Sequence, residues 1–139
     1  MNLHRARQVA YFLLRVVAGL LLFQRGSMKL LGWFGGIPPN GSIAPLMSQL
    51  GIGGVLECFG GLAIMLGLLT RPVAFILCGE MAVAYWQFHA PKGFWPIQNH
   101  GEPAVLLCFI FLYMVAQGGG AWSLDALIRK KREGIASEG

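Results

Sequence analysis

The hydrophobic positions of this 139-residue chain gather in four long runs that short polar segments separate. The runs cover residues 8–31, 51–69, 72–89 and 102–121. Each run is close to the ~20 residues with which a helix crosses a ~30 Å hydrocarbon layer, and none alternates in the manner of a membrane strand. The pattern therefore predicts an all-α fold, an integral membrane four-helix bundle.

Proline residues mark the start of two of these runs. Pro72 and Pro103 stand in the first helical turn, where the missing amide hydrogen costs no intrahelical bond. Because the turn at residues 70–72 is so short, the second and third helices are expected to form an antiparallel hairpin. We expect a single domain at residues 1–128, followed by a polar, basic tail at residues 129–139.

The first run follows basic residues, as the apolar segment of a signal peptide does. However, Arg15 interrupts it, and no A-x-A cleavage site comes after it. We therefore expect an uncleaved first span.

Composition excludes several classes of protein. Hydrophobic residues make up 55% of the chain and charged residues only 12%, which excludes a disordered chain and disfavours a soluble domain of this length. The net charge of +5 suggests nucleic acid at first sight. The cations, however, lie beside and between the apolar runs, so they indicate membrane topology, and we expect no nucleic-acid partner.

The cations also predict the orientation of the protein in the membrane. Of the eleven, Arg15 and Arg25 lie inside the first run, while Lys29, near the end of that run, and Lys92 lie on one side of the predicted bilayer. The other seven lie on the opposite side: Arg5, Arg7, Arg71, Arg129, Lys130, Lys131 and Arg132. Since cytoplasmic loops carry the excess of Lys and Arg, both termini are predicted to be cytoplasmic in a multi-pass bacterial inner-membrane protein.

Ionisable residues inside the predicted spans are costly in hydrocarbon and require a partner or a function. At 1.5 Å per residue, Arg15 and Glu80 both lie ~11–12 Å from the cytoplasmic end of their spans. Tyr113 and Gln117 come to a similar depth on one face of the fourth span. We therefore predict a structural network of Arg15, Glu80, Tyr113 and Gln117, with Arg15 in contact with Glu80.

A second set of polar residues is predicted in the outer half of the bundle. Its members are Arg25, Lys29, Glu57, His89, His100 and Glu102. We expect these side chains to converge on an outward-facing ligand pocket, with glycines of the second span in its wall. The alternative is that they form buried ion pairs that only orient the helices.

Metal and disulfide chemistry are not expected. The spacing of His89, His100 and Glu102 matches no standard metal signature, so we expect no metal site. The number of cysteines is odd, all of them lie inside apolar runs, and none is in a CxxC motif. This pattern argues against a structural disulfide framework.

Several short motifs resemble the DoxX family of small four-helix bacterial membrane proteins. They are Arg15-x3-Gly19-x6-Gly26-x2-Lys29-Leu30, Glu57-x2-Gly60-Gly61-x5-Gly67-Leu68-Leu69-Thr70-Arg71, Gly101-Glu102, and Ser123-Leu124-Asp125 after Gly118-Gly119-Gly120. Their order and spacing extend the resemblance over residues 9–125. The segment at residues 24–26 departs from the family pattern, which often has His or another small polar residue before the glycine, so the resemblance implies no fixed role for Arg25.

The resemblance implies four transmembrane helices with both termini inside. It also implies a link to membrane redox chemistry. DoxD relatives resemble a subunit of thiosulfate:quinone oxidoreductase, and other members are associated with superoxide dismutase and a sulfurtransferase. No catalytic residue follows from it.

Three functional hypotheses follow. The first is a redox-associated protein that binds a quinone-type ligand, in which Arg25 or Lys29 stabilises the reduced head and Glu57, Glu102 or His89 moves protons. If the chain is an enzyme, it is then an oxidoreductase subunit that uses quinone. The second is a non-enzymatic subunit or scaffold that recruits redox protein partners, with homo-oligomerisation left open. The third is a small-solute transporter.

Overall fold

The computed structural model describes residues 2–139, and within that range the fold is all-α, as predicted, with no strand. The α-helices are α1 (Leu3–Leu31), α2 (Gln49–Leu66), α3 (Thr70–Ala84), α4 (Pro96–Asn99), α5 (Glu102–Gln117) and α6 (Leu124–Glu138). The four long helices α1, α2, α3 and α5 overlap the four apolar runs.

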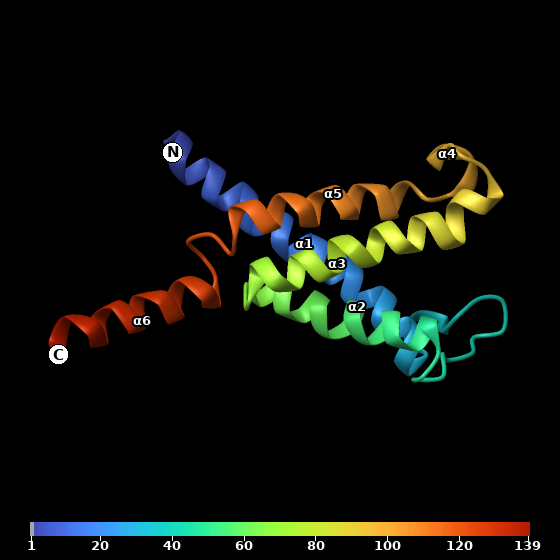
Figure 1. Cartoon of the computed structure of the whole chain (residues 1–139), viewed down its shortest axis with the longest axis horizontal. Coiled ribbons are helices and arrows are strands. Elements are labelled where there is room, and N and C mark those ends of the chain that lie inside the picture. The colour runs from blue at the N-terminus through green and yellow to red at the C-terminus, as the bar shows by residue number, and fades with distance from the viewer. Residues whose placement is uncertain (1) are drawn as a thin grey trace.

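The four long helices pack as two pairs. Helix α1 packs along α2, α3 packs along α5, and α2 joins the pairs through its contact with α3 (Figure 1). The core between them consists of Ala18, Leu22, Ile64, Ala74, Leu77, Met81, Leu107, Phe111 and Met114. We call the end of the bundle that carries the chain termini and the α2–α3 turn the terminal end, and the opposite end the loop end.

Close contact between α1 and α2 depends on glycine. A Cβ atom added to Gly61 would lie 2.6 Å from the carbonyl oxygen of Gly19 and 2.6 Å from the amide nitrogen of Phe23. Gly26 approaches the backbone of Cys58 equally closely. These glycines bring the two backbones together, as small residues do in membrane helix pairs.

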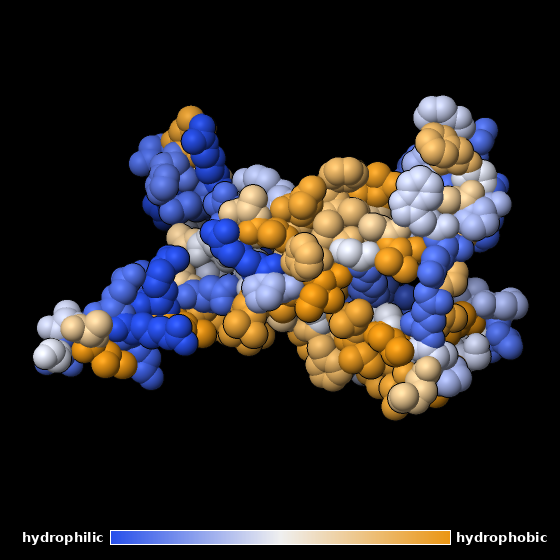
Figure 2. Space-filling model, in the orientation of Figure 1, coloured by the Kyte–Doolittle hydropathy of each residue, from blue (hydrophilic) through white to orange (hydrophobic). Residues whose placement is uncertain are grey.

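Hydrophobic side chains also cover the outside of the bundle. Figure 2 shows them over the middle of one face, with hydrophilic residues gathered over α6 and the first turns of α1. Exposed examples are Leu13, Val17, Phe59, Phe75, Leu106, Phe109 and Leu112. Helices α1 and α2 are long and apolar enough to cross a membrane, and α5 is apolar but shorter, at 16 residues.

The basic tail is helical, which the sequence pattern did not predict. The side chain of Ser123 caps the first turn of α6, where its Oγ accepts a hydrogen bond from the amide of Ala126 at 3.1 Å. The residues that follow are mostly Ala, Leu, Lys, Arg and Glu, which favour helix. These features explain why the tail is a helix. Figure 1 shows that this helix, α6, projects away from the bundle.

Candidate functional site

A pocket of about 410 Å³ lies between α1, α2 and α3 at the loop end. Four of the six residues predicted to form an outer pocket line it: Arg25, Lys29, Glu57 and His89. Glu80 lines it as well. We call this cavity the loop-end pocket.

Lys29 of α1 and Glu57 of α2 form an ion pair in the wall of the loop-end pocket. The Lys29 Nζ lies 2.7 Å from Glu57 Oε2, and the Glu57 side chain is only 3% exposed. The pair is possible because Gly54 of α2 leaves room for the Lys29 stem beside it. The ion pair therefore balances the charge of a carboxylate that would otherwise be costly to bury.

Glu80 of α3 faces the same pocket without a hydrogen-bond partner. Its Oε2 atom is buried and unpaired among the described residues. Its Oε1 atom occupies space that a side chain at Gly53 would fill, since a Cβ there would lie 3.2 Å away. Buried polar atoms normally have a partner, so this carboxyl group is available to a ligand or to water.

His89 reaches the loop-end pocket from an irregular segment. Helix α3 continues past Ala84 as a π-helical turn, Tyr85–His89, a feature that often occurs at functional sites. The His89 ring stacks on Tyr85 with centroids 6.3 Å apart, and its Nδ1 lies 3.0 Å from the carbonyl oxygen of Asn99. These two contacts fix the orientation of the imidazole.

The remaining wall of the loop-end pocket is apolar and reaches the outside of the bundle. Ile52, Ile76 and Val83 line the pocket and are each about half exposed. At the loop end, the side chains of Gln49 and Gln87 hydrogen-bond to each other beside it. The pocket thus combines a polar interior with an apolar rim on the outer side of α2 and α3.

Two of the predicted pocket residues lie elsewhere. His100 is exposed in a left-handed backbone conformation after α4, with φ of 59°, and lines none of the cavities described here. Glu102 is exposed at the start of α5 and lines a separate cavity of about 660 Å³ that Arg25 also reaches. The prediction that all six side chains share one pocket is therefore wrong for His100 and Glu102.

At the terminal end, Arg15 binds backbone carbonyl groups. Its side chain is fully enclosed, at 1% exposure, and donates to the carbonyl oxygens of Gly119 and of Trp122, the latter at 2.6 Å. We call this set of contacts the arginine node. It ties α1 to the segment between α5 and α6.

The predicted contact between Arg15 and Glu80 is wrong, because Glu80 lies in the loop-end pocket. The depth estimate failed because α1 has 29 residues and is ~44 Å long, so its first turns extend past the bundle. Counting from residue 8 therefore placed Arg15 too deep. The Arg15 side chain lies level with Gly67, because a Cβ atom added to Gly67 would lie 3.0 Å from the guanidinium carbon of Arg15.

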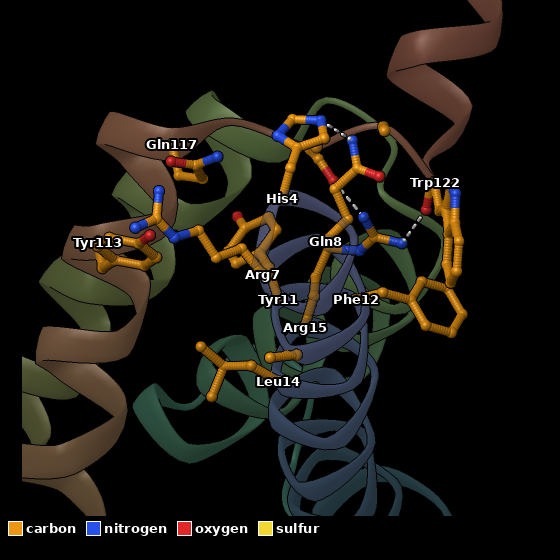
Figure 3. A pocket seen from close by; sticks show the side chains of 14 residues that line it. His4, Arg7, Gln8, Tyr11, Phe12, Leu14, Arg15, Tyr113, Gln117 and Trp122 are labelled. Atoms are coloured by element: carbon orange, nitrogen blue, oxygen red, sulfur yellow. Dashed lines mark hydrogen bonds between the residues drawn. The ribbon is translucent and has the colours of Figure 1, made fainter. Parts of the chain in front are cut away.

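The other three members of that predicted network lie around the same cavity. Arg15, Tyr113 and Gln117 line one cavity of about 820 Å³, which we call the terminal-end pocket (Figure 3). Tyr11, which the sequence pattern did not single out, joins them: its hydroxyl donates to the carbonyl of Gly118, and its ring meets that of Tyr113 edge-on with centroids 5.8 Å apart.

Asp125 is a further polar residue without a predicted role. Its carboxylate accepts hydrogen bonds from the amides of Leu69 at 2.8 Å and Thr70 at 2.9 Å. These amides begin α3, so Asp125 caps that helix from the start of α6. In the sequence, Asp125 was noted only as part of the Ser123-Leu124-Asp125 motif. Its capping role became visible only in the fold, where it lies beside the start of α3.

The three cysteines are unbonded. The Sγ atoms of Cys78 and Cys108 lie 3.7 Å apart between α3 and α5, and Cys58 is buried. Over residues 2–139, no group of three or more His, Cys, Asp or Glu side chains is arranged to hold a metal ion.

Comparison with known proteins identifies relatives over most of the chain. The DoxX family profile matches residues 10–90. A protein of Haemophilus influenzae that is described only as uncharacterized is 41% identical over 137 residues, covering 94% of this chain and 98% of the relative. The inner membrane protein YqjF of Escherichia coli is 29% identical over 143 residues, covering 91% of this chain and 98% of the relative. No solved structure matches the chain.

Proposed function

The chain belongs to the DoxX family and resides in the bacterial inner membrane, and on this premise we propose that its loop-end pocket binds a small lipophilic ligand with a polar head, of the quinone type. The observation that carries the proposal is the unpaired carboxyl group of Glu80 in a cavity with an apolar, membrane-facing rim. A volume of about 410 Å³ is in the range of small-molecule sites.

The polar groups of the pocket fit the head of such a ligand. Quinone oxygens are acceptors when oxidised, and Lys29 and Arg25 are donors that would also stabilise negative charge on the reduced head. Glu80 and His89 can accept or release protons. The ion pair of Lys29 with Glu57 holds the ammonium group in place for this role.

The rim suggests how the ligand enters. Ile52, Ile76 and Val83 line the pocket and are about half exposed on the face that α2 and α3 present to lipid. A hydrophobic tail lying between these residues would remain in the bilayer while the head enters the pocket. This arrangement favours a membrane-soluble ligand over a water-soluble one.

Titration of the detergent-solubilised protein with decylubiquinol, kept in its reduced form and followed by calorimetry, tests the proposal. We expect saturable binding, weakened about tenfold by Glu80→Gln, because the quinol hydroxyl group donates to the Glu80 carboxylate and a hydrogen bond to a charged group contributes ~1.5–3 kcal/mol. Glu102→Gln is the matched control, since Glu102 is an exposed carboxylate at the same end of the bundle outside the pocket. Equal affinity of the two variants, or no saturable binding, would refute the assignment.

We also propose that α1, α2, α3 with its π-helical turn, and α5 cross the membrane, with both termini in the cytoplasm. The seven-to-two distribution of cations supports this orientation. A membrane-impermeant thiol reagent added from the periplasm should label Lys92→Cys but not Ser137→Cys, in a background without native cysteines. The reverse labelling pattern would contradict it.

A second candidate function, a scaffold for redox partner proteins, is favoured by α6. This helix projects from the bundle and exposes Leu127, Ile128 and Ile135 beside four basic residues. Affinity purification in mild detergent should retain a soluble partner with the full chain and lose it when residues 129–139 are deleted. Equal recovery with both chains would contradict this function.

A further inference from the structure

The terminal-end pocket has a composition that the ligand proposed for the loop-end pocket does not explain. Its polar lining consists of His4, Arg7, Gln8, Tyr11, Arg15, Tyr113 and Gln117. No Asp or Glu lines it within the described part of the chain. A cavity of about 820 Å³ with two arginines and no carboxylate has a positive potential, which favours an anion.

No carboxylate of the described residues forms an ion pair with the arginines of this pocket. Arg15 is 1% exposed, and its Nε atom has no hydrogen-bond partner within residues 2–139. Arg7 forms no ion pair in that range, where the one ion pair joins Lys29 to Glu57. In Figure 3 the Arg7 side chain extends from α1 toward Tyr113 and Gln117 of α5.

The remaining wall of the terminal-end pocket is apolar. Phe12, Leu14 and Trp122 line it, and the Phe12 and Trp122 rings meet edge-on with centroids 5.5 Å apart. Leu14 continues into the exposed apolar surface of α1 at Leu13 and Val17. Tryptophan favours the boundary between hydrocarbon and water, where lipid headgroups lie.

From this combination we propose that the terminal-end pocket binds the phosphate of an anionic phospholipid of the bilayer. Arg7 donates to the phosphate, with the Tyr113 hydroxyl and Gln117 amide as further donors. Arg15 contributes positive charge from the pocket wall, while an acyl chain lies along Leu14. Basic pockets between membrane helices are known to recognise lipid headgroups in this way. The site is at the opposite end of the bundle from the loop-end pocket, so the two proposals succeed or fail separately.

The test is a titration of delipidated, detergent-solubilised full chain with dioleoylphosphatidylglycerol, followed by native mass spectrometry and by the melting temperature. A bound lipid stabilises the folded state, so the melting temperature should rise and saturate. Arg7→Gln should weaken the apparent affinity about fivefold, the equivalent of ~1 kcal/mol for one charge. Arg5→Gln is the matched control, because Arg5 is exposed on the same helix but does not line the pocket. Its affinity should stay within about twofold of wild type.

Separate arms distinguish the source of the phosphate. Dioleoylphosphatidylcholine and inorganic phosphate, at the same concentrations, should give no saturable shift. An equal response to phosphatidylcholine would overturn the requirement for an anionic headgroup, and an equal response to inorganic phosphate would assign the site to a soluble anion. Equal weakening by Arg5→Gln and Arg7→Gln would show diffuse attraction and overturn the site itself. Equal melting temperatures of the variants without lipid will show that both are folded.

Discussion

The arginine node and the loop-end pocket both place charged side chains inside the bundle, but the protein treats these charges differently. In the arginine node, both terminal nitrogens of Arg15 donate to backbone carbonyl groups. In the loop-end pocket, Glu80 faces a cavity with one carboxyl oxygen buried and unpaired among the described residues. A charge satisfied by the backbone holds the fold together, whereas a charge left beside a cavity is available for binding.

The contrast shows why burial alone does not identify a functional residue. Arg15 is more enclosed than Glu80, yet its contacts are structural. Both side chains line a cavity, but the terminal nitrogens of Arg15 are bonded to backbone carbonyl groups, whereas the Glu80 carboxyl group has no partner in the space that Gly53 keeps open. Substitutions in the arginine node should therefore mainly lower stability, whereas substitutions in the loop-end pocket should mainly weaken ligand binding.

The largest effect on stability is expected at the arginine node. Arg15→Met removes two charge-assisted hydrogen bonds and leaves the carbonyls of Gly119 and Trp122 without this donor, so the free energy of unfolding should fall by about 3 kcal/mol. Arg15→Lys should recover only part of this, because an ammonium group lacks the planar fork of guanidinium. Unfolding in mixed micelles measures the loss. Arg5→Met, an exposed site on the same helix, should change stability by less than ~0.5 kcal/mol. A similar loss in both Met variants would argue against the node.

The next largest effect on stability is expected at the contact between α1 and α2, the two helices that carry residues of both the arginine node and the loop-end pocket or pack beside them. Gly61→Ala places a methyl group against the backbone of α1 at Gly19 and Phe23, and overpacking of this kind costs ~1–3 kcal/mol. Gly79→Ala is the matched control, because a Cβ there meets nothing within 4 Å. The same mixed-micelle unfolding experiment should separate the two variants. Equal stability would show that α1 and α2 do not approach as described.

A smaller effect is expected from the cap on α3. Asp125→Ala removes the acceptor for the amides of Leu69 and Thr70 and should lower stability by ~1 kcal/mol. In this variant, the rate of amide hydrogen exchange should increase more at Leu69 and Thr70 than at the other amides of α3. Glu133→Ala, farther along α6, should leave both quantities unchanged. Unaltered exchange in the Asp125 variant would contradict the capping role.

The smallest effect on stability is expected in the loop-end pocket. The Oε2 atom of Glu80 has no hydrogen-bond partner that Glu80→Gln could remove. Without ligand, the free energy of unfolding of this variant should therefore stay within ~0.5 kcal/mol of wild type. Mixed-micelle unfolding of ligand-free protein measures this directly. A loss as large as that expected for Arg15→Met would place Glu80 among the structural residues and remove the contrast between the two regions.

Sequence periodicity was sufficient to predict α1, α2, α3 and α5, because the four apolar runs have a length and composition that favour helix, but it missed α6. The 4-3-4-3 spacing of Arg15, Gly19, Leu22, Gly26 and Lys29 places these residues on one face of α1, where the first four are buried and Lys29 is partly exposed. Four of the six predicted pocket residues share the loop-end pocket, since helical depth and phase fix their height and direction. Depth counting failed for Arg15, because a helix that projects beyond the bundle has no visible boundary in the sequence.

Other features depended on contacts between distant segments. The polar partners of Arg15 are carbonyl groups, which every residue carries, so no side-chain pattern could reveal them. The positions of His100 and Glu102 depend on the irregular segment after α3, whose path no periodicity specifies. Arg7 was counted only as a topology signal, because its place in the terminal-end pocket follows from the way α1 passes the end of α5.

The central claim is that Glu80 faces a ligand rather than the protein. Mass spectrometry of small molecules extracted from protein purified out of native membranes tests it most directly, with wild type, Glu80→Gln and Glu102→Gln prepared in parallel. The account predicts a quinone that copurifies with wild type and with Glu102→Gln, and that is strongly depleted in Glu80→Gln. Quinone recovered equally from all three, or from none, would contradict it.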